Sequence, residues 1–345
     1  MNPSDINPLK WQDDALVLID QRVLPGEEIW TQNRTVAEVV SAIRDMVVRG
    51  APAIGIAGAY GMVFAADAAW QLAGAGWRKA WLADVDALRH ARPTAVNLAW
   101  AIDVMLEHAA GIEGAPRDAM LAEAIRIHTE DLAANHRMGE LGAALIEPGV
   151  RVMTHCNAGA LATAGHGTAL GVIRDAYAAG RIVEVFATET RPWLQGARLT
   201  SWELSRSGIP VRLITDGSAA HVMRTQGVRW VIVGADRVAA NGDVANKIGT
   251  YSLAIAAKAH GAKVMVVAPR STIDLATATG DDIEIEERTG SEITTIGGRR
   301  YAPEEVTAFN PVFDVTPAHL IDALVTEVGV VHKPDREGLA RLLAP

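Results

Sequence analysis

The pattern of apolar positions changes at Pro148-Gly149. Beyond it, short and nearly continuous apolar runs alternate with stretches of helical period, which indicates parallel strands joined by crossover helices. The expected strands are Arg151 to His155, Ile182 to Thr188, Val211 to Thr215, Trp230 to Gly234 and Lys263 to Ala268. The expected helices are Thr168 to Ala179, Arg198 to Ser207, Ala219 to Gln226 and Lys247 to His260, and a further helix opens at Thr316-Pro317 and runs through Leu324.

Before Pro148 the pattern is mainly helical. The apolar run from Leu16 to Asp20 predicts a short strand, and the residues from Glu27 to Trp30 predict its return strand in a hairpin. Thr35, with Glu38 three residues later, has the spacing of a capping box. The apolar stripe that follows predicts a helix from Val36 to Val48.

The fold class follows from these two patterns. The chain has 345 residues, which is enough for two domains. We expect an α/β protein with a mainly helical N-terminal domain, including the short hairpin, in residues 1–147. A Rossmann-like parallel-sheet domain is expected in residues 148–345.

The stretch from Val152 to Gly171 carries the only cysteine of the chain, Cys156, where the first parallel strand ends. Glycines in the loop that follows remove β-carbons where the backbone turns, and the next helix presents unpaired N–H groups. Such a point stabilises an anion or a thiolate, so Cys156 is a candidate reactive thiol. The alternative is that Cys156 is a small buried apolar residue.

Other strand ends add candidate chemistry, because ligands of parallel sheets bind outside the carboxyl ends of the strands. Asp236 follows an apolar strand, and desolvation there would raise its pKa and keep a proton available for general acid catalysis. Asn246 and Lys247 are expected to open a helix and meet a phosphate. Gln195 is a candidate for hydrogen bonds to sugar hydroxyls, and nearby Trp193 offers apolar surface.

The N-terminal half contains two further candidate anion sites. In Arg49-Gly50-Ala51-Pro52, Gly50 is placed as a helix C-cap and Pro52 suits the first turn of the next helix. Arg49 with the free N–H groups of that helix start would bind phosphate, and the alternative is a tightly packed helix pair. Arg92 precedes Pro93, where it is either an anion ligand or a solvated surface charge.

Composition narrows the function classes. The net charge of −9 argues against non-specific nucleic-acid binding, and one cysteine excludes a disulfide framework or a cysteine-rich zinc site. The apolar run from Ala51 to Ala66 is too short to span a membrane, and the N-terminus lacks the pattern of a signal peptide, so a cytoplasmic location is expected. A dinucleotide cofactor is disfavoured because Gly165, Gly167 and Gly171 miss the fingerprint spacing.

Six motifs together resemble the methylthioribose-1-phosphate isomerase family of methionine salvage, which is related to the regulatory subunits of translation initiation factor 2B. They span nearly the whole chain and begin at Asp20-Gln21-Arg22, Arg49-Gly50-Ala51-Pro52, Arg92-Pro93-Thr94, Thr154-His155-Cys156-Asn157, Glu189-Thr190-Arg191-Pro192-Trp193 and Gly234-Ala235-Asp236-Arg237. The resemblance implies a helical N-terminal domain, a Rossmann-like C-terminal domain and a homodimer. It also implies that a sugar phosphate is the partner, without a cofactor or a metal.

The resemblance assigns roles to nine residues. Asp236 and Cys156 are implied to be catalytic, with Asp236 as the proton donor. The positions implied to contact substrate are Arg49, Gly50, Ala51, Arg92, Gln195, Asn246 and Lys247.

The implied reaction converts an aldose 1-phosphate to a ketose 1-phosphate, and the sequence leaves its route open. Cys156 either carries a proton from C2 to C1 or shapes the site for a hydride shift. Two other functions also remain open: an isomerase of 5-deoxyribose 1-phosphate or ribose 1,5-bisphosphate, and a non-catalytic regulatory subunit of the same fold.

Overall fold

The computed structural model describes residues 6–92 and 96–344. Packing contacts divide the chain into two compact units. Unit 1 comprises Met1–His136 and Gly159–Gly167, and unit 2 comprises Arg137–Ala158 and Thr168–Pro345. The chain therefore passes from unit 2 into unit 1 and back again within a few residues of Cys156.

Unit 1 begins with a three-stranded antiparallel sheet of order β1-β2-β3. Its strands are Leu9–Gln12, Ala15–Ile19 and Trp30–Asn33. Every residue of β2 is buried, as the apolar run predicted. The predicted return strand at Glu27 to Trp30 is misplaced, because the pairing of β2 with β3 starts at Trp30.

The first helix, α1 (Val36–Arg44), has the predicted capping box. The Thr35 hydroxyl accepts from the Glu38 backbone N–H, and the Glu38 carboxylate accepts from the Thr35 N–H. The helix ends earlier than the predicted Val48, because Met46 takes a left-handed φ of 60°.

The long helix α2 (Ala51–Ala73) forms the centre of unit 1. Its glycines let a neighbouring helix approach closely: a β-carbon on Gly55 would lie 2.7 Å from the backbone oxygen of Asn97. By length and composition, the helical stretch from Ala51 to Ala80 passes a test for a membrane span, but 78% of its most apolar window is buried within the protein. Such extensive burial within the protein is typical of a core helix.

The remaining elements of unit 1 are helical and complete the predicted helical region. They are η1 (Gly74–Gly76), α3 (Trp77–Ala80), α4 (Leu82–Arg89), α5 (Val96–Ala110) and the first part of α6 (Arg117–Ala144). A short 3-10 turn, η2 (Ala160–Ala162), also belongs to this unit. Of the predicted Arg92-Pro93-Thr94-Ala95 segment, Arg92 is described, and residues 93–95 lie outside the described residues.

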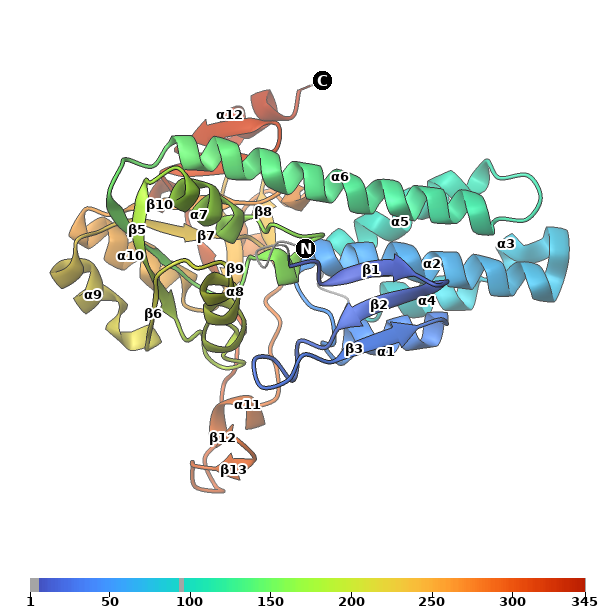
Figure 1. Ribbon diagram of the computed structural model, residues 1–345, viewed down its shortest axis with the longest axis horizontal. Coiled ribbons are helices and arrows are strands. Elements are labelled where there is room, and N and C mark those ends of the chain that lie inside the picture. The colour runs from blue at the N-terminus through green and yellow to red at the C-terminus, as the bar shows by residue number, and fades with distance from the viewer. Residues whose placement is uncertain (1–5, 93–95, 345) are drawn as a thin grey trace. The chain divides into compact units, whose positions relative to one another are not determined.

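Unit 2 contains a seven-stranded sheet of order β16-β15-β10-β7-β4-β5-β6 (Figure 1). Its strands in chain order are β4 (Val150–Thr154), β5 (Ile182–Thr188), β6 (Val211–Ile214), β7 (Val228–Val233), β10 (Lys263–Val267), β15 (Ala323–Thr326) and β16 (Gly329–His332). The first six of these strands pair in parallel, and β16 is antiparallel to β15. This is the doubly wound order of a Rossmann sheet, so the predicted α/β class is confirmed.

The predicted crossover helices of unit 2 are present, and most of their bounds agree within two residues. They are α7 (Ala169–Ala178), η3 (Gly196–Thr200) continuing into α8 (Ser201–Arg206), η4 (Asp216–Ser218) with α9 (Ala219–Gln226), and α10 (Thr250–His260). A core cluster packs between the sheet and these helices, with Met153, Val231 and Leu253 among its members.

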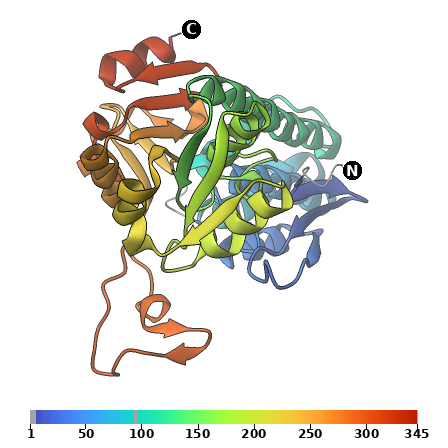
Figure 2. The same cartoon turned by 60° about the vertical axis from the view of Figure 1, so that its left-hand side comes forward.

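A second sheet in unit 2 has the order β11-β8-β9-β14. Its strands are β8 (Arg237–Ala239), β9 (Val244–Lys247), β11 (Ile273–Asp274) and β14 (Phe313–Thr316). Between β11 and β14, a segment with η6 (Gly280–Asp282), α11 (Ser291–Thr294), β12 (Thr295–Ile296) and β13 (Arg299–Arg300) projects from the sheets of this unit (Figure 2).

Two predictions for unit 2 are wrong. The helix expected to run from Thr316 through Leu324 is only the short turn η7 (Ala318–Leu320), because the residues after it form strand β15 beside β10. The helix expected to start at Lys247 begins at Thr250, since Asn246 and Lys247 pair with β14 as part of β9. Other short elements are η5 (Arg270–Thr272) and the C-terminal helix α12 (Arg336–Leu342).

Candidate active site

The order of strands changes direction between β4 and β7, and this point carries two of the predicted catalytic residues. Strands β5 and β6 lie on one side of β4, whereas β7, β10 and β15 lie on the other. Cys156 follows the end of β4 and Asp236 follows the end of β7. Ligands of open α/β sheets bind outside such a switch point, so the topology brings the two residues to the expected edge.

Cys156 occupies a strained backbone position at the end of β4. Its φ is 64°, in the left-handed region that residues with a side chain seldom adopt. Its N–H donates to the Thr190 hydroxyl at 2.9 Å, and its carbonyl accepts from the Thr200 hydroxyl at 2.5 Å. Thr190 itself has a φ of 61°, so two neighbouring strand ends are strained and bonded to each other.

Gln195 contacts the thiol directly. Its Nε2 donates to Cys156 Sγ at 3.3 Å, and the side chain is only 3% exposed. In the part of the chain that the structure describes, the buried Oε1 of Gln195 has no hydrogen-bond partner. A buried carbonyl of this kind retains the capacity to accept from a hydroxyl group. Trp193, two residues earlier, has the Arg198 guanidinium 4.2 Å from its ring centroid.

A buried ion pair supports the backbone on the other side of Cys156. Glu203 is completely buried, and its carboxylate accepts from Arg174 at 2.8 Å and from the Asn157 amide at 2.9 Å. Because Asn157 follows Cys156 in the chain, this pair fixes the loop immediately after the thiol.

Lys247 is a buried cation near both predicted catalytic groups. It is 8% exposed, and burial lowers the pKa of its ammonium to about 8. Cys156 and Asp236 act in the opposite direction and raise the Lys247 pKa, so both lie within electrostatic range of the ammonium. The Nζ lies 3.8 Å from the centroid of the Phe313 ring.

Strand β9 places Asn246 and Lys247, which were predicted to lie at a helix start. The Asn246 amide donates to the Thr250 hydroxyl at 2.9 Å, and Thr250 donates to the Lys247 carbonyl at 2.7 Å. Gly249, with a φ of 105°, turns the chain from β9 into α10. The two residues therefore come from a strand that precedes the helix.

Asp236 lies on the connection between β7 and β8. Its N–H donates to the Ala245 carbonyl at 2.9 Å, and its side chain is partly exposed. The structure thus places Cys156, Gln195, Asp236, Asn246 and Lys247 in unit 2, on the segments that follow β4, β5 and β7.

The other four predicted site residues, Arg49, Gly50, Ala51 and Arg92, belong to unit 1. Gly50 was predicted to be a helix C-cap, which is wrong, because α1 already ends at its C-cap Asp45. Gly50 has a φ of 95° and is the N-cap of α2, and it provides no side-chain cap for the free N–H groups of that helix. The predicted Pro52 lies in the first helical turn. The grouping of these residues with the five of unit 2 stays a prediction.

Gly50 contacts a loop that continues from Cys156 in the chain. A β-carbon at Gly50 would lie 2.5 Å from the β-carbon of Ala162. The same loop is held by Gln21, whose amide donates to the Leu161 carbonyl at 2.7 Å, and by Asp131, whose carboxylate accepts from the Ala164 N–H at 2.8 Å. Any residue other than glycine at position 50 would therefore require this loop to move.

Sequence reasoning missed three residues that shape the site, Thr190, Thr200 and Phe313. Thr190 was noted only as part of a strand end, and its positive φ leaves no mark in the sequence. Phe313 reaches Lys247 through the pairing of β14 with β9, across a sequence separation that no local pattern reveals.

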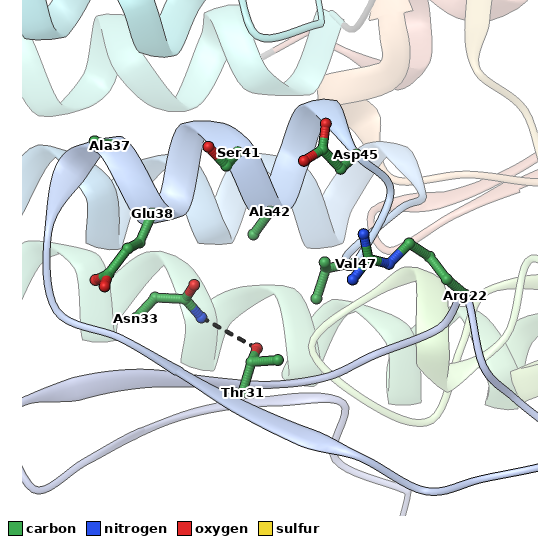
Figure 3. A pocket seen from close by; sticks show the side chains of 9 residues that line it. All are labelled: Arg22, Thr31, Asn33, Ala37, Glu38, Ser41, Ala42, Asp45 and Val47. Carbon is green, nitrogen blue, oxygen red and sulfur yellow. Dashed lines mark hydrogen bonds between the residues drawn. The ribbon is translucent and has the colours of Figure 1, made fainter.

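Two cavities lie near predicted motifs. One, of about 390 Å³ in unit 1, is lined by Arg22, Ser41 and Asp45 among others, with Asn33 and Thr31 bonded to each other along its wall (Figure 3). The other, of about 350 Å³ in unit 2, is lined by His155, Thr188, Asp216 and Gly249 with residues of α9 and α10. Among residues 6–92 and 96–344, there is no cluster of three or more His, Cys, Asp or Glu that fits a metal ion.

Comparisons with known proteins agree with the motifs. A model of the initiation factor 2 subunit family matches residues 47–333. The chain is 60% identical over 326 residues to a methylthioribose-1-phosphate isomerase of Alkalilimnicola ehrlichii, with 94% of each chain covered. It is 57% identical to that of Pseudomonas syringae pv. syringae, with 98% of this chain and 96% of the relative covered.

Solved structures give the same result. The 5-methylthioribose 1-phosphate isomerase of Pyrococcus horikoshii has a TM-score of 0.91 and 41% identity, and the match covers 97% of this chain and 95% of that one. A structure from A. fulgidus, described as subunit delta of translation initiation factor eIF-2B, has a TM-score of 0.86 and 42% identity, with 98% and 99% covered.

Proposed function

Because the chain belongs to the initiation factor 2 subunit family, among its methylthioribose-1-phosphate isomerases, we propose that it converts 5-methylthioribose 1-phosphate into 5-methylthioribulose 1-phosphate in methionine salvage. The observation that carries the proposal is the 60% identity to a relative of that name over 94% of both chains. The cluster of Cys156, Gln195, Asp236 and Lys247 supports an enzyme over a regulatory subunit, since it combines a thiol, an acid and a buried cation at the switch point.

The phosphate on the anomeric carbon prevents the substrate ring from opening as a free hemiacetal. The bond between C1 and the ring oxygen must break, and the ring oxygen must take a proton. Asp236 supplies that proton in the proposed mechanism. As the C2 ketone forms, the 2-hydroxyl loses its proton to the Asp236 carboxylate, which returns Asp236 to its protonated form.

Hydrogen must also move from C2 to C1, and two routes remain. In the first, the Cys156 thiolate takes the C2 proton, leaving an enol, and returns it to C1. In the second, hydrogen migrates from C2 to C1 with its electron pair, and Cys156 only polarises the site. In the first route, the Gln195 Nε2 N–H that donates to Cys156 Sγ would stabilise negative charge on the sulfur.

Substrate binding is assigned to the other residues of the predicted set. The Gln195 Oε1, which is buried without a partner in the described chain, would accept from a sugar hydroxyl. Lys247 would bind an anionic oxygen of the substrate with its neighbour Asn246. Arg49, Gly50, Ala51 and Arg92 are proposed as phosphate ligands, with the free N–H groups at the start of α2.

Two broader features belong to the same proposal. The protein is proposed to work in the cytoplasm, where an enzyme of methionine salvage meets its soluble substrate, and as a homodimer, as the family resemblance implies. Helix α10 supports association because it exposes Tyr251 (40%) and Ile255 (48%). Light scattering on the purified protein would test the dimer, and a monomeric mass would contradict it.

Turnover of three sugars tests the proposed function. Purified protein should form ketose from 5-methylthioribose 1-phosphate with a strong preference over 5-deoxyribose 1-phosphate and ribose 1,5-bisphosphate. Preference for another sugar would keep the chemistry but change the pathway. Binding without turnover on all three would contradict the enzymatic role and favour a regulatory one.

A further inference from the structure

The imidazole of His155, immediately before Cys156, is bonded at both ring nitrogens. Its Nε2 lies 2.8 Å from the Ile248 carbonyl oxygen, and its Nδ1 lies 2.6 Å from the Thr188 hydroxyl. A carbonyl oxygen can only accept, so Nε2 carries the proton. Burial lowers the pKa of His155 and keeps the ring neutral, which leaves Nδ1 as an acceptor for the Thr188 hydroxyl.

The chain of hydrogen bonds continues from Thr188 to Cys156. The Thr188 and Thr190 hydroxyl oxygens are 3.0 Å apart, and Thr190 Oγ1 accepts from the Cys156 N–H at 2.9 Å. The Thr188 proton points to His155, and the Thr190 hydroxyl lies 3.0 Å from the Thr188 hydroxyl oxygen and 3.3 Å from the Thr188 carbonyl oxygen, both of which can accept its proton. The contacts run from the Cys156 amide to the Ile248 carbonyl.

The two ends of this chain are next to reactive groups. One end is the backbone N–H of Cys156, and the other is the carbonyl of Ile248, the residue after Lys247. Gly249 makes room for the ring, because a β-carbon there would lie 3.0 Å from His155 Cε1. Among charged groups near the ring, Asp216 favours the protonated form of His155 and Lys247 disfavours it.

We propose that His155 is a positioning residue that, through Thr188 and Thr190, fixes the backbone of Cys156 relative to the turn that follows Lys247. The neutral ring with a single tautomer acts as a fixed spacer between β4 and the turn after β9. An ammonium near sulfur stabilises the thiolate, so a change in this spacing alters the reactivity of the thiol. The effect on turnover rests on the proposed function, whereas the effect on the thiol does not.

Cys156 is the only cysteine of the chain, so its alkylation by iodoacetamide at a fixed neutral pH reports this site alone. Thr188→Val removes the bridging hydroxyl at nearly constant volume, and Thr188→Ser retains it. Thr272→Val is the matched control, because Thr272 is completely buried and its hydroxyl has no partner in the described part of the chain. Far-ultraviolet circular dichroism and the melting temperature identify variants that have not folded.

We expect Thr188→Val to slow alkylation and to lower kcat by about three- to tenfold, with little change in KM, as expected for one lost hydrogen bond. Thr188→Ser and Thr272→Val should have the same alkylation rate and the same kcat as the unmodified protein. The proposal would be overturned if all variants were alkylated at the same rate. It would also be overturned if Thr188→Val and Thr188→Ser slowed alkylation equally. If Thr188→Val does not fold, His155→Gln replaces it; slowed alkylation supports the proposal and an unchanged rate refutes it.

The alkylation series separates this inference from the proposed function. If the unmodified protein turns over none of the sugars but Thr188→Val still slows alkylation selectively, the proposed reaction is wrong and the positioning role of His155 stands. If the unmodified protein turns over 5-methylthioribose 1-phosphate normally but Thr188→Val does not change the alkylation rate, the proposed reaction stands and the positioning role of His155 is wrong.

Discussion

The Lys247 ammonium lies 3.8 Å from the centroid of the Phe313 ring, in a position that is 8% exposed. The aromatic face attracts the cation and partly replaces the water that the ammonium has lost. The pairing of Phe313 with Lys247 between β14 and β9 fixes this arrangement in the backbone. The charge state of Lys247 is therefore sensitive to both pH and the ring.

The first prediction concerns pH. Burial lowers the Lys247 pKa to about 8, so the side chain is charged below that pH and neutral above it. A neutral amine does not attract phosphate, and kcat/KM for the sugar phosphate should fall as pH rises through about 8. Above about pH 7 the phosphate is already mainly a dianion, so its own titration does not produce this limb. A flat profile from about pH 7 to 10 would contradict the role of Lys247.

Removal of the Phe313 ring should move that limb. In Phe313→Leu the ammonium loses a cation–π interaction of about 0.5–2 kcal/mol, which favours the neutral amine. The descending limb of kcat/KM should move to lower pH by roughly 0.4–1.5 units. A limb that stays in place would show that Phe313 does not stabilise the cation.

Gly50 gives a prediction for stability. Gly50→Ala would place a β-carbon 2.5 Å from that of Ala162 at a φ of 95°. We expect a loss of about 2–4 kcal/mol in the free energy of unfolding, from overpacking and left-handed strain together. Gly180→Ala is the matched control, since its φ is 68° but no atom lies within 4 Å, and it should lose about 1–2 kcal/mol. Urea unfolding measures the free energy of unfolding of both variants. Equal losses would show that the contact with Ala162 does not contribute to the cost of Gly50→Ala.

Asp236 is tested by a change that keeps its shape. Asp236→Asn removes the proposed acid and should lower kcat by about 10²- to 10⁴-fold, while binding of the sugar phosphate is retained. Single-turnover assays and calorimetry measure the two effects separately. Glu189→Gln, at the end of β5, is a control for the loss of a strand-end carboxylate and should leave kcat within about twofold. Normal turnover by Asp236→Asn would refute the assignment.

The buried pair of Glu203 with Arg174 should contribute to stability. Glu203→Gln removes the charge of a carboxylate that is completely buried and that pairs with Arg174 at 2.8 Å. We expect a loss of roughly 3 kcal/mol in the free energy of unfolding, because breaking a buried ion pair by changing one partner is strongly destabilising. Glu130→Gln, which breaks an exposed pair with Arg126, should cost less than about 1 kcal/mol. Similar costs for both would contradict the importance of burial.

Local sequence patterns were sufficient for much of the fold. The capping box of Thr35 and Glu38 and the helix start at Pro52 depend on neighbouring residues, and both are confirmed. Most of the parallel strands were recognisable because they are buried on both faces and read as apolar runs, whereas β6 at the edge of the sheet is largely exposed. The ends of these strands, Cys156 and Asp236 among them, were expected to converge on one edge of the sheet, because ligands of parallel sheets bind outside the carboxyl ends of the strands.

The errors occurred where distant segments decide the local structure. Asn246 and Lys247 are followed by a helical pattern, but pairing with β14, more than sixty residues later, makes them a strand. The residues after Pro317 carry a helical pattern, yet Ala323–Thr326 completes the parallel sheet beside β10. Tertiary contacts override local preference at such positions. The left-handed backbones of Cys156 and Thr190 also depend on the folded site and have no local signature.

The division of the chain into units has a consequence for dissecting the protein. Gly159–Gly167 packs with unit 1, although β4 before it and α7 after it pack with unit 2. A fragment ending at His136 would lack Leu161, Ala162 and Ala164, all of which are buried in the intact protein. Cleavage at one peptide bond cannot release either unit whole. Neither unit is therefore a continuous segment that a truncated gene could encode.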